Sequence, residues 1–127
     1  MTTKLLRLFQ LALLVMAFLS PSVTYAKALC PMLNAPSIQA CVDDKIAQVV
    51  DELSINIAQI HQLYKNAPDK LTSFDRAQQT WDAYRKLQCL SVYQHWQGDE
   101  IADLMTASCA IELGRQRNQF LRQHYLQ

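Results

Sequence analysis

The sequence predicts an all-α fold, a three-helix antiparallel bundle cross-linked by two disulfides. Apolar residues recur at intervals of three and four over long stretches, which is typical of helices, and no segment shows the alternation of a strand. The chain of 127 residues contains four cysteines, an even number, and all of them follow an apolar N-terminal segment. A domain of this size buries a modest core, so disulfides would add useful stability.

The N-terminal segment is typical of a secretory signal peptide. Lys4 and Arg7 precede an apolar run at residues 11–19, and small residues near position 26 suit a cleavage site. A mitochondrial presequence would be amphipathic and richer in arginine. Because nine apolar residues fall short of the roughly 20 that span a bilayer, we expect no permanent membrane anchor. We predict a signal peptide at residues 1–26, one helical domain at residues 27–127, and a periplasmic or secreted location.

The charge of the predicted mature domain excludes one class of partner. The segment to be removed carries two of the twelve basic residues and none of the eleven acidic ones. The remaining ten basic and eleven acidic residues give a formal charge of −1. With no basic stripe along any predicted helix, nucleic acid is not an expected partner.

The first helix is expected at residues 37–66. Ser37 would cap its first amides, and the acidic pair Asp43 and Asp44 would suit the positive end of its dipole. Pro68 limits its other end. Its apolar positions form one continuous stripe of Val42, Ile46, Val49, Leu53, Ile57, Ile60 and Tyr64.

Two further helices follow. The second stripe begins with Phe74, Ala77, Trp81 and Tyr84 and continues less regularly through Leu87, Leu90 and Tyr93. It stops at Gln97 and Gly98, where glycine can adopt the left-handed conformation that ends a helix. The third helix is expected at residues 99–124. Acidic residues at its start and arginines toward its end complement the helix dipole.

The spacing of the last two cysteines predicts a disulfide. Cys89 and Cys109 lie ten residues before and ten residues after Asp99. If the second and third helices fold back near Asp99, their equal rise of ~1.5 Å per residue places both cysteines level. Packed helices then bring inward-facing α-carbons to the ~4.4–6.8 Å that a disulfide accepts. By elimination Cys30 pairs with Cys41, although a Cys41–Cys89 bond stays possible because the first helix also runs antiparallel to the second.

The residues that often carry chemistry do not form a site in the sequence. The cysteines lack the close pairs of a zinc site and the C-x-x-C spacing of a redox motif. The histidines His61, His95 and His124 are scattered, which favours solvated surface positions over metal ligands. Serine-nucleophile motifs and glycine-rich phosphate loops are missing as well. We therefore expect no metal, no cofactor and no enzymatic activity.

One segment has a recognisable pattern. The run AQQTWDAYRKLQC at residues 77–89, the GDE at residues 98–100, and the later ELGRQRNQFL resemble the lysozyme inhibitor LprI-like family of secreted bacterial proteins. The matching positions are Gln79, Trp81, Arg85, Cys89, Cys109 and Arg117. The first helix departs from the family pattern, since Leu53-Ser54 stands where a Leu-Asn pair is usual. The resemblance implies inhibition of lysozyme-type peptidoglycan hydrolases.

The matched residues also predict local structure. Trp81, Arg85 and Cys89 are spaced by four and form one ridge of the second helix. The arginine stem can pack over the indole, while its head reaches a carboxylate such as Asp82 or one on the third helix. We interpret this cluster as a stabilising one, with direct partner binding as the alternative.

An inhibitor of a lysozyme must fill a cleft that carries two carboxylates. Donors on the turns between helices are best placed to protrude. The turn before the second helix supplies Lys65, Asn66, Asp69 and Lys70, and the turn after it supplies His95, Gln97 and the backbone of Gly98. We favour the first turn because it has two lysines.

Two other functions are compatible with the sequence. The first is an envelope interaction or immunity protein that acts on a different target. The second is a small lipid-carrying module, which would need a cavity that three helices of this length can hardly enclose.

Overall fold

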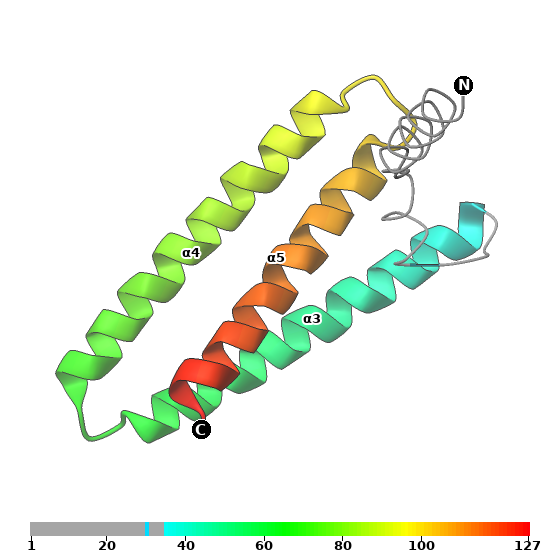
Figure 1. The fold of residues 1–127 in the computed structure, drawn as a ribbon. Coiled ribbons are helices and arrows are strands. Elements are labelled where there is room, and N and C mark those ends of the chain that lie inside the picture. The colour runs from blue at the N-terminus through cyan, green and yellow to red at the C-terminus, as the bar shows by residue number, and fades with distance from the viewer. Residues whose placement is uncertain (1–29, 31–34) are drawn as a thin grey trace, which may run out of the picture.

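The described part of the chain forms three long helices that run antiparallel in sequence order (Figure 1). The computed structural model describes Cys30 and residues 35–127. Within them, α3 spans Ala35–Leu63, α4 spans Pro68–His95 and α5 spans Ala102–Tyr125, and no strand occurs. The predicted fold class is therefore confirmed. The expected signal peptide lies outside the described residues.

The start of α3 differs from the prediction. Because the helix begins at Ala35, Ser37 lies inside it, and the expected cap at Ser37 is wrong. Asp43 and Asp44 lie beyond the first helical turn, which contains no acidic residue. Pro36 is compatible with the earlier start, since a proline in the first turn removes an N–H that has no helical partner there. The helix therefore begins before its apolar stripe does.

A short turn connects α3 to α4. The backbone N–H of Ala67 donates to the carbonyl oxygen of Tyr64 at 2.8 Å. Pro68 then occupies the first turn of α4, and Asp69 lies in the same turn. An acidic residue and a proline both favour a helix start at this position.

The turn between α4 and α5 contains the expected glycine stop. Gly98 has a φ of 97°, in the left-handed region that glycine adopts without a steric penalty. Next to it, the backbone N–H of Asp99 donates to the carbonyl oxygen of Trp96 at 3.0 Å. Since α5 begins at Ala102, Asp99 and Glu100 precede the helix, and only Asp103 lies in its first turn.

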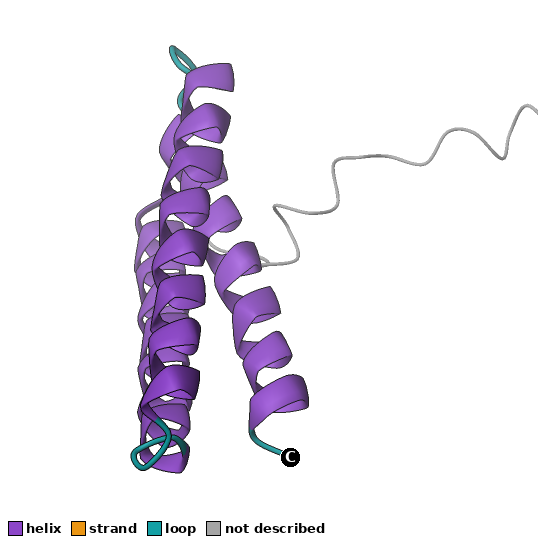
Figure 2. Ribbon diagram, turned by 90° about the vertical axis from the view of Figure 1, so that its left-hand side faces the viewer, coloured by secondary structure: helices purple, strands orange, loops and turns teal. Residues whose placement is uncertain are grey.

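The last helix packs against both of the others. The extensive helix contacts are those of α3 with α5 and of α4 with α5. In Figure 2, α4 lies in front of α3 and the two overlap as one layer, while α5, which ends at the C label, stands beside them on the right as a second layer. The α3–α5 interface contains most of the core. Most of the buried apolar residues fall into two clusters, one of Cys30, Val42, Val49 and Ile111 and one of Ile60, Phe74 and Leu121.

The second helix buries less than its sequence suggested. Its only buried residues are Phe74 and Cys89. Four apolar residues assigned to its stripe are largely exposed, at 51% for Tyr84, 68% for Leu87, 50% for Leu90 and 37% for Tyr93. Residues spaced by three fall about 60° short of a full turn at each step, so this series turns away from α5.

A glycine and a buried asparagine on α5, Gly114 and Asn118, lie where α3 approaches it closely. A Cβ atom on Gly114 would overlap Cγ1 of Val49, so the contact requires glycine at this point. One turn later, Asn118 is fully buried and accepts a hydrogen bond from Nδ2 of Asn56 at 3.0 Å. Its own Nδ2 donates to the carbonyl oxygen of Val49 at 3.0 Å. The buried amides thus find partners across the interface.

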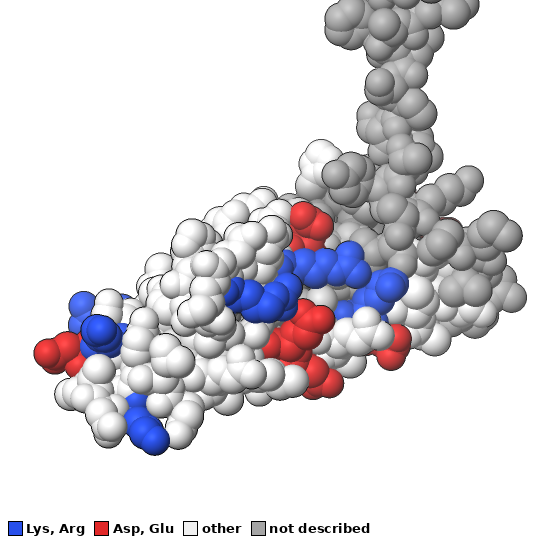
Figure 3. Space-filling view, turned by 60° about the horizontal axis from the view of Figure 1, so that its bottom comes forward, with Lys and Arg blue, Asp and Glu red and all other residues white. Residues whose placement is uncertain are grey.

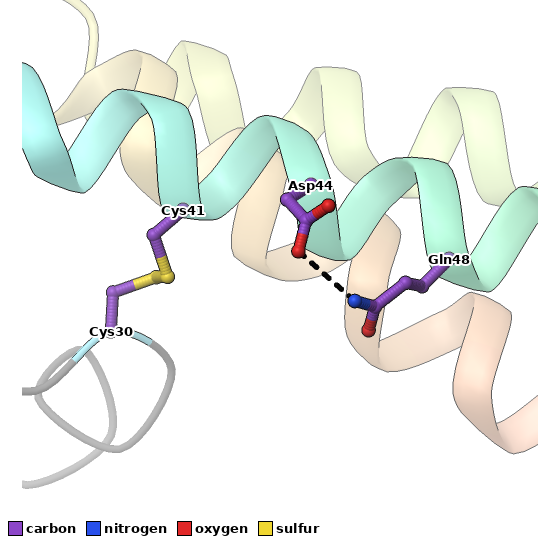
Figure 4. Close-up of a disulfide and its surroundings, with 4 residues drawn as sticks. All are labelled: Cys30, Cys41, Asp44 and Gln48. Carbon is purple, nitrogen blue, oxygen red and sulfur yellow. Dashed lines mark hydrogen bonds between the residues drawn. A yellow bond between two sulfur atoms is a disulfide. The ribbon is translucent and has the colours of Figure 1, made fainter.

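Both cross-links lie at the same end of the bundle. The α-carbons of Cys89 and Cys109 are 5.6 Å apart, and those of Cys30 and Cys41 are 6.2 Å apart. The Cys30–Cys41 bond joins Cys30 to α3 (Figure 4), about one turn before Asp44, which accepts a hydrogen bond of 3.0 Å from Nε2 of Gln48. The alternative Cys41–Cys89 bond is not formed. Among the described helices, none combines the length and apolar content that a bilayer crossing requires.

Candidate functional site

Three of the matched residues form one cluster around the indole of Trp81. The guanidinium carbon of Arg85 lies 5.7 Å from the Trp81 ring centroid, and that of Arg117 lies 5.6 Å from it. Both distances are within the ~6 Å range of cation–π contacts. The predicted packing of Arg85 on Trp81 is confirmed. Arg117 adds a second cation from α5, and it lies 5.6 Å from the ring of Phe120 as well.

The cluster has more positive than negative charge. Nη2 of Arg85 donates to Oδ1 of Asp82 at 2.8 Å, while Nζ of Lys86 lies 2.7 Å from Oδ2 of the same carboxylate. The hydrogen bonds from Lys86 and then Arg85 hold the pKa of Asp82 below its usual value. The carboxylate of Asp82 therefore pairs with two cations, Arg85 and Lys86.

Arg117 is bound differently from Arg85. Its Nε donates to Oε1 of Gln78 at 3.0 Å, and in the described part of the chain no carboxylate forms an ion pair with it. Burial lowers the pKa of Arg117, although an arginine stays charged at neutral pH. Nε of Arg85 and Nη2 of Arg117 are buried without a hydrogen-bond acceptor among the described residues. A buried donor without an acceptor costs about 1–3 kcal/mol, so this cluster would gain from an added acceptor.

An apolar groove lies beside the cluster and involves all three helices. α3 contributes one wall through residues such as Val50 and Leu53, and α4 contributes Trp81 and Arg85. The floor is α5, at Ala110 and Gly114. The groove has a volume of about 130 Å³. It exists because α3 and α4 both pack against α5 and leave a gap between each other.

The residues predicted on the first turn lie at one end of the bundle. Lys65 and Asn66 are exposed in the turn, and Asp69 and Lys70 are exposed in the first turn of α4. Nζ of Lys70 lies 5.8 Å from the centroid of the Tyr64 ring. Figure 3 shows basic and acidic side chains together at this end, on the left, and a mixture of both signs elsewhere on the same face.

A shallow hollow of about 360 Å³ adjoins this turn. It extends from Tyr64, Asp69 and Lys70 to Phe74 on α4 and Tyr125 near the end of α5. The hollow does not reach the Trp81 cluster. Since Lys70 and Trp81 are eleven residues apart on one helix, about 16 Å separates them along its axis. The turn and the cluster are therefore two different surfaces.

The three histidines are exposed, and each contacts an aromatic ring. Nε2 of His61 lies 2.7 Å from Oδ1 of Asp75, which connects α3 to α4, and the His61 ring meets Phe74 edge-on. The rings of His95 and Trp96 are 5.2 Å apart, and those of His124 and Phe120 are 4.4 Å apart. Among the described residues, no three side chains of the metal-binding types come together.

A comparison with known protein families covers the residues around Trp81. The family model described as lysozyme inhibitor LprI matches residues 31–121. The chain belongs to the LprI family. Comparisons with curated proteins and with solved structures gave no match. The match covers nearly all of the three helices, including both Cys89 and Cys109 and the cluster of Trp81, Arg85 and Arg117.

The sequence did not reveal two features of this LprI-family chain. The groove could not be predicted, because it depends on how the three helices pack against one another, and the apolar stripe of a single helix does not determine that packing. The close contact at Gly114 had one signal, a glycine within an otherwise regular helix, which often marks a close packing contact.

Proposed function

We propose that this LprI-family protein is exported and inhibits a lysozyme-type peptidoglycan hydrolase by occluding its active-site cleft. Membership of a family described as lysozyme inhibitors carries the proposal. The two disulfides support an oxidising location such as the periplasm, because such bonds persist there and rarely in the cytosol. The family is one of inhibitors, which supports a protein partner and no catalytic role of its own.

The end of the bundle at the α3–α4 turn is the surface that we propose to enter the cleft. It is narrow, since only one turn and the last residues of α5 form it (Figure 1). Lys65 and Lys70 are exposed there, and their ammonium groups would face the two cleft carboxylates. Lys70 is partly held by Tyr64, which lowers the entropy lost when it binds. Asn66 and Asp69 would hydrogen-bond the rim of the cleft.

Inhibition assays test the proposal. Protein purified from the periplasm after expression of the full chain is assayed against chicken-type, goose-type and invertebrate-type lysozymes on peptidoglycan. We expect inhibition of at least one type at micromolar protein. Lys65→Ala/Lys70→Ala should weaken the inhibition about tenfold or more, because the carboxylates of the lysozyme cleft would lose the cations that pair with them. Arg115→Ala, an exposed change on α5, should leave it unchanged.

Two results would contradict parts of this proposal separately. No inhibition of any type would refute the lysozyme function and favour an envelope interaction or immunity protein with another target. Inhibition that survives Lys65→Ala/Lys70→Ala would retain the function and exclude the turn as its surface. N-terminal sequencing of the exported protein tests the signal peptide, since cleavage after Ala26 leaves Lys27 as the first residue.

A further inference from the structure

The groove between the three helices has the size of one side chain. Its volume of about 130 Å³ is close to the ~150 Å³ of an apolar cavity that holds one benzene molecule. A leucine side chain is no larger than benzene, whereas a lipid acyl chain is several times longer. The groove is therefore too small for a lipid tail and suits a single aliphatic side chain.

The groove is open to solvent along one wall. Val50, which lines it from α3, is 52% exposed, and the side chain of Arg85, which lines it from α4, is 30% exposed. A side chain that enters would contact Val50, Leu53 and the indole of Trp81. It would do so without displacing a buried residue, because Ala110 and Gly114 leave the floor low.

The charges beside the groove favour an anion next to that side chain. Arg85, Lys86 and Arg117 bring three positive charges, against the single carboxylate of Asp82 that Arg85 and Lys86 share. Nε of Arg85 has no acceptor among the described residues. A carboxylate at the rim would supply that acceptor once the guanidinium turns toward it, and guanidinium–carboxylate pairs are often bidentate.

We propose that this groove docks a partner protein through an aliphatic side chain that has a carboxylate beside it in the partner. The aliphatic group fills the space between α3 and α4, and the carboxylate pairs with Arg85 at the rim. Trp81 provides the wall that both groups touch. This surface is separate from the α3–α4 turn, so the inference goes beyond the proposed function and does not require the partner to be a lysozyme.

Peptide titrations followed by NMR test this docking site. The probes are Ac-Gly-Leu-Glu-Gly-NH2, its Leu-Gln analogue and its Ser-Glu analogue, added to the periplasmic protein. The reporters are the indole N–H of Trp81, assigned with Trp96→Phe, and the amide of Gly114, one of two glycines. We expect saturable shifts at both reporters with the Leu-Glu peptide, at a Kd of roughly 1 mM. The Leu-Gln peptide should bind about fivefold more weakly, the effect of one partly exposed ion pair.

Variants of the protein separate the two halves of the site. Arg85→Gln should weaken the Leu-Glu peptide about fivefold and leave the Leu-Gln peptide unchanged, which completes a double-mutant cycle for the ion pair. Ala110→Met fills the groove and should abolish saturable binding of both peptides. If Ala110→Met does not fold, Val50→Ser on the exposed wall should weaken both peptides instead. Arg115→Gln is the control, since this exposed arginine does not line the groove.

Three results would overturn the proposal. One is equal affinity for the Leu-Glu and Leu-Gln peptides, which removes the role of Arg85. Another is binding that Ala110→Met or Val50→Ser leaves unchanged, which removes the groove. The third comes from 4-methylpentanoate, which joins a leucine-like group to a free carboxylate. If this acid shifts the Trp81 indole and no peptide does, the groove is a small-molecule site and not a docking site.

Discussion

Replacing Gly114 with alanine tests whether the close approach of α3 and α5 holds the fold together. On an isolated helix, Gly114→Ala would be stabilising by about 1 kcal/mol, because alanine is the better helix former. In the folded protein the new Cβ would overlap Cγ1 of Val49, which is 8% exposed and part of the core. Valine is restricted to few rotamers in a helix, so its methyl group cannot simply turn away.

The overlap should outweigh the helix propensity. Forcing an extra methyl group into a packed core costs about 1–3 kcal/mol and sometimes more. We expect Gly114→Ala to lower the free energy of unfolding by about 1–2 kcal/mol, with a decrease in Tm of roughly 4–16 °C for a domain of this size. Urea unfolding followed by far-UV circular dichroism, with the disulfides intact, measures this change. Gln116→Ala, at an exposed position of the same helix, should change it by less than about 0.5 kcal/mol.

A second substitution identifies the cause. Val49→Ala alone should cost about 2 kcal/mol, because it removes two buried methyl groups. If the methyl overlap is the reason for the loss, Val49→Ala/Gly114→Ala should be at least ~1 kcal/mol more stable than the sum of the two single changes. Simple additivity would refute the overlap. A Gly114→Ala protein that is more stable than the unchanged chain would show that α3 and α5 do not meet as closely as the structure has them.

Three further changes test the interactions between helices. Asn118→Ala should lower the free energy of unfolding by about 1–3 kcal/mol in urea unfolding, because it leaves the buried amide of Asn56 without its partner, and a loss below ~0.5 kcal/mol would contradict the buried network. Cys89→Ser/Cys109→Ser should cost about 3 kcal/mol through the larger entropy of the unfolded chain, and an unchanged Tm would exclude a structural role for that bond. Asp82→Asn should cost less than about 1 kcal/mol, because the Asp82 side chain is 38% exposed. The pKa of Asp82 is lowered in the folded state. Its contribution to the free energy of unfolding is therefore complete above the unfolded pKa of ~3.9 and disappears as the pH falls through the folded pKa. A stability difference between the unchanged protein and Asp82→Asn that persists in strong acid would argue against the pairing with Lys86 and Arg85.

The helices and their cross-links could be predicted because they depend on local and regular features. The apolar stripe of α3 repeats every three to four residues, which only a helix brings to one face. The register of Cys89 and Cys109 follows from the constant rise of a helix and the position of Gly98. The packing of Arg85 on Trp81 follows from a spacing of four residues. Each of these inferences concerns either one helix or two helices that are joined by one short turn.

The remaining features depend on which helices pack against each other, and the residue pattern of a single helix does not determine this. No sequence pattern indicates that α5 contacts both other helices while α3 and α4 make few contacts with each other. That choice exposes Leu87 and Leu90, which their spacing had suggested as part of a packed stripe. It also creates the groove beside Trp81, and it explains why Arg117 joins a cluster that was predicted from α4 alone. The early start of α3 at Ala35 was missed because the apolar stripe begins only at Val42 and does not mark the first residues of the helix.

The two disulfides join cysteines that are neighbours in chain order, Cys30 with Cys41 and Cys89 with Cys109. A polypeptide that enters an oxidising compartment with its N-terminus first exposes each thiol shortly before its correct partner. Bonds made in order of emergence would then be the final ones, and no exchange between thiols would be needed afterwards. If the protein is exported as we propose, its folding should therefore require a thiol oxidase and proceed at a normal yield in cells that lack a disulfide isomerase.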